Sequence, residues 1–158
     1  MSSSKSFLTC SVGVSAYLGA AAFIANKQYL TAAGSILAVE ARHNTFIIGA
    51  NKGNPIPSSL DTPLDFDEVY SIASAFITSC PSTNPALPVK GFPRLVVKGS
   101  PKVYSGQTIK VSGKWTDGIY AVILSGLSSY PVKVMNNEFM FPSDPTIMGQ
   151  VSLLYRQF

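Results

Sequence analysis

The spacing of the apolar residues changes across a proline-rich stretch, and this change limits the possible folds more than any other feature. Before residue 80, apolar residues recur every three or four positions, as in amphipathic helices. Prolines at positions 81, 85, 88 and 93 interrupt the pattern, and the short segments after them are rich in β-branched and aromatic residues. We therefore expect an α+β protein with a helical region over residues 1–80, a proline-rich linker over 81–93 and a small antiparallel β-sandwich over 94–158.

The helical region contains three predicted helices. The first runs from about residue 7 or 12 to residue 25, and the second, from about residue 29 to residue 50, forms a hairpin with it. The third is short, about four turns, with Thr62 as its N-cap and Pro63 in its first turn. The acidic residues before and within it suit the positive end of a helix dipole: Asp61, Asp65, Asp67 and Glu68.

Six short segments of the second region predict strands, separated by turn formers such as Asn136-Asn137. The predicted strands are residues 95–97, 108–111, 119–124, 132–135, 138–141 and 150–155. Short strands with a turn about every ten residues are typical of an antiparallel sandwich.

Composition restricts the class of protein. With 158 residues, 46% apolar and 13% charged, the chain is suited to one compact domain or two small ones rather than to disorder. The net charge is +4, and no acidic residue occurs between Leu87 and Thr116. The lysines of this stretch suit a solvated face, and an anionic partner is the alternative. We expect no nucleic-acid partner.

The first helix contains no charged residue from Phe7 to Ala25. Serines, glycines and a tyrosine dilute its apolar character, so we expect a helix packed against others and no membrane span, with a targeting sequence as the alternative. Whether Met1 is the natural start stays open. Cys10 and Cys80 are the two cysteines, and they leave both disulfide formation and cellular compartment undecided.

The second predicted helix carries Glu40 and His43, three residues apart, within an apolar stripe. Residues three apart lie on one face of a helix, so a carboxylate and an imidazole at these positions can bind one metal ion. A buried carboxylate is costly unless it has a cation or hydrogen bonds. Glu40 and His43 are therefore candidate metal ligands, and hydrogen bonding of Glu40 within the protein is the alternative.

The order of these segments resembles the ferritin-like domain proteins of the fungal stress-response and plant desiccation-related type. The resemblance rests on residues 12–21 (VGVSAYLGAA), 29–33 (YLTAA), 35–43 (SILAVEARH) and 80–88 (CPSTNPALP), and on the β-rich C-terminal part that ends with Gly149-Gln150-Val151. It implies that the hairpin corresponds to the last two helices of a four-helix bundle, so this chain resembles only the C-terminal half of that family. It also implies an extracellular or cell-wall location, although the chain has no clear signal peptide.

The family resemblance implies a di-iron ligand set that this chain lacks in large part. The two earlier bundle helices, with a glutamate and a first Glu-x-x-His motif, are missing. Thr9, Cys10 and Ser11 stand where a further glutamate is expected. We therefore expect no cofactor in a single chain, but iron, zinc or manganese if a second chain completes the bundle with its own Glu40 and His43.

Three functions follow as hypotheses. The first is a non-catalytic stress- or desiccation-related structural or interaction protein, which forms a homo-oligomer through its helical hairpin. The second is the dimeric metal-binding protein. The third is a module that binds cell-wall polysaccharide or another anionic polymer through Trp115, Tyr104, Tyr120 and Tyr130. No Gly-x-Ser-x-Gly motif or phosphate-binding loop supports an enzyme.

Overall fold

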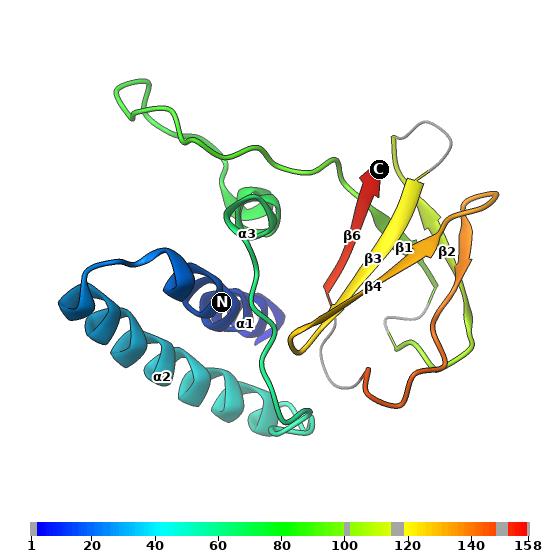
Figure 1. The fold of residues 1–158 in the computed structure, drawn as a ribbon, viewed down its shortest axis with the longest axis horizontal. Coiled ribbons are helices and arrows are strands. Elements are labelled where there is room, and N and C mark those ends of the chain that lie inside the picture. The colour runs from blue at the N-terminus through cyan, green and yellow to red at the C-terminus, as the bar shows by residue number, and fades with distance from the viewer. Residues whose placement is uncertain (1–2, 100–101, 115–118, 148–151, 158) are drawn as a thin grey trace. The chain divides into compact units, whose positions relative to one another are not determined.

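A computed structural model describes residues 3–99, 102–114, 119–147 and 152–157 (Figure 1). Helices form the N-terminal half and two small antiparallel sheets follow them, which confirms the predicted α+β class. The chain divides into two compact units, Met1–Gly91 and Phe92–Phe158. Within the described residues, no helix is sufficiently long and apolar to span a membrane.

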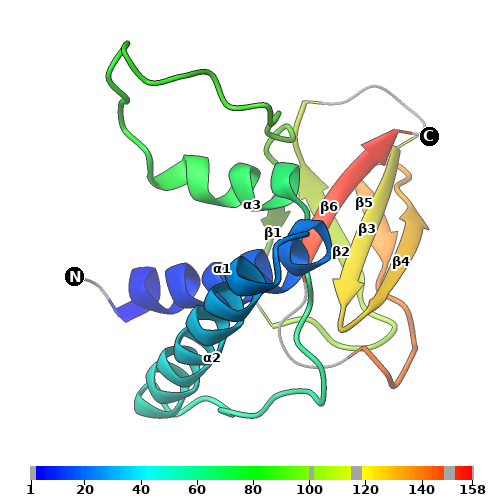
Figure 2. The same cartoon turned by 60° about the vertical axis from the view of Figure 1, so that its left-hand side comes forward.

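The first unit is built on a helical hairpin. Helix α1 (Ser3–Ala20) is followed by a short 3-10 helix, η1 (Ala21–Phe23), and by α2 (Lys27–Ala50), which packs along α1 (Figure 2). The side-chain oxygen of Asn26 accepts hydrogen bonds from the backbone N–H groups of Gln28 and Tyr29 and caps α2. The predicted hairpin is therefore present, and α2 begins two residues earlier than expected.

Helix α3 (Phe66–Ala73) begins later than the sequence predicted, and the 3-10 helix η2 (Ser74–Phe76) follows it. Its N-cap is Asp65, not Thr62. Asp65 accepts a hydrogen bond from the backbone of Glu68, and the Glu68 carboxylate accepts one from the Asp65 N–H at 2.7 Å. The prediction of Thr62 and of four turns was wrong because Leu64, between the two positions, is bound to α1.

Leu64 crosses α1 at close range. Its N–H donates to the carbonyl oxygen of Ser15, and a methyl group at Gly19 would overlap the Leu64 carbonyl. In the described part of the helical unit, Val14 and Leu64 are the buried apolar side chains, each 3% exposed. The apolar core of this unit is therefore thin.

The second unit contains six strands in two three-stranded antiparallel sheets, as predicted. One sheet has the order β1-β2-β5 and the other β4-β3-β6, and Figure 2 labels all of these strands. The strands are β1 (Val96–Lys98), β2 (Thr108–Ser112), β3 (Ile119–Ser125), β4 (Ser128–Lys133), β5 (Glu138–Met140) and β6 (Ser152–Gln157). The predicted strand 132–135 begins four residues later than β4, which includes Pro131. β4 is an edge strand, where proline is tolerated.

Both sheets contribute to one apolar core. Ile109 of β2, Ile123 of β3 and Phe139 of β5 belong to the same buried cluster, and Ile123 is fully buried. The turn before β5 contains Asn136 and Asn137 with φ of 52° and 60°, the left-handed conformation that asparagine tolerates. The alternation of buried and exposed residues along β2 follows from this arrangement, with one face on the core and the other in solvent.

Candidate metal centre

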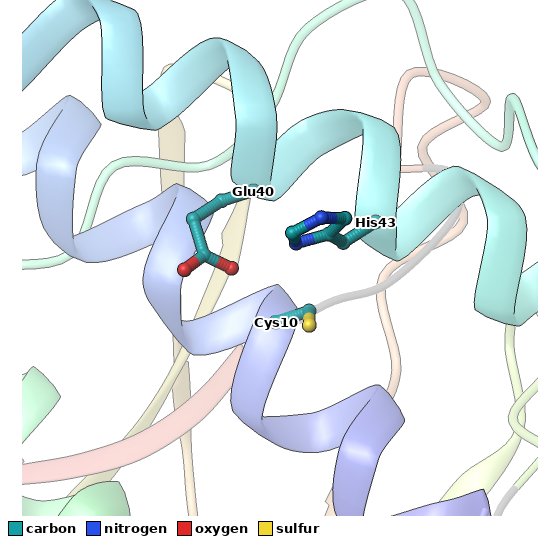
Figure 3. A group of neighbouring side chains, drawn as sticks. All are labelled: Cys10, Glu40 and His43. Atoms are coloured by element: carbon teal, nitrogen blue, oxygen red, sulfur yellow. The ribbon is translucent and has the colours of Figure 1, made fainter.

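Three possible metal ligands from two helices meet in the hairpin. The Cys10 thiol comes from α1, and the Glu40 carboxylate and the His43 imidazole come from α2; their ligand atoms all lie within 4.8 Å of one another. In Figure 3 the Glu40 carboxylate is directed from α2 toward α1, beside the ring of His43 and close to Cys10. Cys10 and Glu40 are half-buried, whereas His43 is exposed to solvent.

The absence of a side chain at Gly13 makes room for Glu40. A methyl group at Gly13 would lie 3.0 Å from both Cδ and Oε2 of Glu40, closer than ordinary packing permits. Gly13 lies three residues after Cys10, so both residues are on the face of α1 that meets α2. The carboxylate therefore lies against the backbone of α1, beside the thiol.

A buried polar contact next to the site holds the two helices in register. The Ser11 hydroxyl donates a hydrogen bond of 2.9 Å to the side-chain carbonyl oxygen of Asn44, and Ser11 is 5% exposed. Ser11 follows Cys10 in the chain and Asn44 follows His43. This bond thus limits how far the thiol and the imidazole can move apart along the helix axes.

The thiol has an unusual electrostatic environment. Burial of Cys10, the negative charge of Glu40 and the hydrogen bond that the thiol donates to Glu40 all raise the pKa of Cys10 above its ordinary value of 9.0. Both cysteines are free, so Cys10 is not bonded to Cys80. In the metal-free protein at neutral pH, Cys10 is therefore a neutral thiol that donates a hydrogen bond to a carboxylate.

The structure places the predicted pair, Glu40 and His43, next to each other, and their role as metal ligands stays a prediction. Cys10 was not predicted as a third donor, because neither cysteine belongs to a familiar metal-binding motif. A signal did exist: Cys10 lies in the short segment where the family resemblance implies a glutamate. The Glu40 carboxylate accepts a hydrogen bond from this thiol on the neighbouring helix.

The other charged candidates have structural roles. Asp65 and Glu68 cap α3, and Asp67 accepts a hydrogen bond of 2.9 Å from the backbone N–H of Lys90. In the β unit, Lys110 forms an exposed ion pair with Glu138 at 3.1 Å. The acidic cluster therefore orders the start of α3 and fastens the proline-rich segment to it.

The aromatic residues named in the polysaccharide hypothesis differ in their environments. Tyr104 is 69% exposed, whereas Tyr130 packs against the core and its hydroxyl is 2.9 Å from that of Thr146. Tyr120 is half-buried, and Trp115 lies outside the described residues. Tyr104 alone of the three described tyrosines thus presents most of its ring to solvent.

Comparison with protein families gives a match over the helical hairpin. Residues 3–52 match the family described as the ferritin-like domain, which is less than half of the 158-residue chain. The match spans α1, η1 and α2 and ends two residues after α2. A search of curated proteins finds no match. The N-terminal hairpin is thus similar to a ferritin-like domain, and the candidate metal centre lies inside the matched residues.

Proposed function

We propose that this protein is a non-catalytic structural or interaction protein of the ferritin-like, stress- and desiccation-related type, and that two copies associate through their helical hairpins. The observation that carries this proposal is the exposure of α2. None of the 24 residues of this helix, all within the described ranges, is buried. Helices in proteins are stabilised mainly by burying an apolar face, so a helix this exposed and this apolar needs a partner.

The exposed apolar residues of α2 follow a heptad spacing. Tyr29, Ile36 and Phe46 are 70%, 42% and 76% exposed, and they lie on one side of the helix, next to the side that contacts α1. Residues spaced alternately by three and four positions form a line along one side of a helix, and a second helix can pack over this line. We call this line the outer seam, and it consists of Tyr29, Ala32, Ile36, Val39, His43 and Phe46.

A second copy of the same chain suits the outer seam. In an antiparallel pair related by a two-fold axis, the seam is complementary to itself: when Ile36 lies opposite Val39 of the second copy, Tyr29 lies opposite its Phe46. The aromatic Tyr29 then faces an aromatic residue and the aliphatic Ile36 an aliphatic one, while Ala32 faces His43 of the second copy. Two hairpins also supply four helices, the number in a ferritin-like bundle.

Molar mass in solution tests this proposal. Light scattering coupled to gel filtration should give twice the chain mass of 16.8 kDa at micromolar concentration. Ala32→Arg should reduce this to one chain mass, because it places a bulky cation on the seam opposite His43 of the second copy. Ala38→Arg is the matched control, since Ala38 is also exposed but lies on the other side of α2. A wild-type mass of one chain would contradict the proposal.

A further inference from the structure

The ferritin-like match implies a site of two iron ions bridged by carboxylates, and the donors in this hairpin do not fit one. Such a site needs several glutamates. In the described part of the chain, the group of possible ligands holds a single carboxylate, that of Glu40. Of the two other glutamates, Glu68 caps α3 and Glu138 belongs to the β unit, where it pairs with Lys110. The donor set is one sulfur, one nitrogen and one carboxylate.

This donor set suits a different class of ion. A thiolate favours softer or borderline cations over the harder ions that all-oxygen sites prefer, and sulfur, imidazole and carboxylate are the ligands of zinc. We propose that Cys10, Glu40 and His43 of a single chain bind one borderline-soft divalent cation of the zinc class, and that the Cys10 thiol releases its proton to solvent as the metal–sulfur bond forms. The fourth position of a tetrahedral site is left for solvent.

The distances support this assignment. Zinc ligands lie about 2.0–2.3 Å from the ion, so in a tetrahedral site they are about 3.5 Å apart. The donor atoms here lie within 4.8 Å of one another. The side chains of all three donors rotate about their χ angles, and a change of rotamer moves a donor atom by more than this difference. His43 is exposed, so its ring is free to turn toward the thiol.

The surroundings keep the donors in place. Gly13 leaves space for the Glu40 carboxylate beside Cys10, and the Ser11–Asn44 hydrogen bond holds the helices in register. All three donors come from one chain, so the site does not depend on the proposed association. This differs from the sequence-based hypothesis, in which each of two chains contributes Glu40 and His43.

Cobalt substitution is the sharpest test, because a cobalt–thiolate bond has a charge-transfer band in the near ultraviolet. The purified full chain should bind one Co²⁺ or Zn²⁺ per chain and show this band. Cys10→Ser should abolish the band and lower the zinc affinity by more than about 100-fold. Loss of a group that only orients a metal ligand lowers affinity by at most about 100-fold, so a larger loss identifies Cys10 as a ligand. Cys80→Ser, the matched thiol control, should leave both unchanged, since Cys80 is exposed and is not part of the group.

Two further variants separate this site from folding and association. In the Ala32→Arg background, where the chains do not associate, His43→Ala removes an exposed ligand, so it should lower zinc affinity without changing the circular dichroism spectrum or the unfolding midpoint. Ala32→Arg, two turns from Glu40, should retain the band even in a protein with the mass of one chain. The inference is overturned if Cys10→Ser and Cys80→Ser bind zinc equally well, if no divalent cation of this class binds, or if two iron ions bind per chain without a thiolate band.

Discussion

The Glu40 carboxylate of α2 occupies the space that a side chain at Gly13 of α1 would fill, with only 3.0 Å between its Oε2 atom and the position of a methyl group there. Gly13→Ala should therefore push the carboxylate away from Cys10 and His43. The end of a glutamate side chain moves easily, and alanine favours a helix by about 1 kcal/mol over glycine, so stability should change little. Zinc affinity should fall by at least about tenfold, as when a group that orients a ligand is lost.

Gly34→Ala is the control for this substitution. Gly34 is also in a helix, and a methyl group there has nothing within 4 Å. It should raise the free energy of unfolding by up to about 1 kcal/mol and leave the zinc affinity unchanged. Isothermal titration with zinc and urea denaturation measure the two effects. Equal zinc affinity in both variants would contradict the proposed role of Gly13.

Gly19→Ala should destabilise the helical unit. Leu64 crosses α1 so closely at this position that a methyl group would overlap its carbonyl oxygen, and the backbone of Leu64 cannot move away without loss of its hydrogen bond to Ser15. Forced overpacking of this kind costs about 1–3 kcal/mol. Urea denaturation, with Gly34→Ala as reference, measures the loss. A Gly19→Ala protein as stable as Gly34→Ala would show that the segment before α3 does not bind α1 in this way.

Ser11 and Asn44 should be energetically coupled. Their side chains form a hydrogen bond of 2.9 Å between α1 and α2, and Ser11 is buried. A double-mutant cycle of Ser11→Ala and Asn44→Ala should give a coupling energy of about 1 kcal/mol. Thr45→Ala serves as control, because the Thr45 hydroxyl bonds only to the backbone of its own helix at Ala41. Strictly additive effects of the Ser11 and Asn44 substitutions would exclude the contact.

Cys10 should react slowly with alkylating reagents. Burial, the charge of Glu40 and a hydrogen bond to Glu40 raise the pKa of its thiol, so less thiolate is present at a given pH above neutrality than at a free cysteine. At pH 8, the exposed Cys80 should be alkylated faster. Glu40→Gln removes the charge, lowers the pKa of Cys10 toward 9.0 and should speed its reaction. The rates are followed by mass spectrometry of metal-free protein, and an unchanged Cys10 rate in Glu40→Gln would disprove this coupling.

Ile123→Ala should destabilise the β unit by about 3 kcal/mol. Ile123 is fully buried between residues of both sheets, and truncation of a buried isoleucine leaves a cavity. Leu127→Ala, at a residue 72% exposed beside β4, should change stability by less than about 0.5 kcal/mol. Thermal unfolding of both variants makes the comparison. A small effect at Ile123 would mean that the two sheets do not share one core.

Much of the fold could be predicted because its signals are local. The spacing of three and four residues around Glu40 predicts α2 from the residues of that helix alone. The turn at Asn136-Asn137 is likewise predicted from the backbone conformations that these two asparagines tolerate. The predictions failed where contacts from another element decide the outcome. Thr62 is a good N-cap by sequence, but Leu64 is bound to α1 and the helix begins only after Asp65.

By itself, the sequence determined that this is an α+β protein and that Glu40 and His43 lie on one side of a helix, because periodicity within an element sets which residues share a face. Only the tertiary structure decided that Cys10 lies beside them and that Gly13 leaves room for the carboxylate. These contacts depend on how α1 crosses α2 and in which register. That register is set by packing and by the hydrogen bond between Ser11 and Asn44. These two residues are 33 positions apart, so the spacing of residues within either helix does not predict their contact.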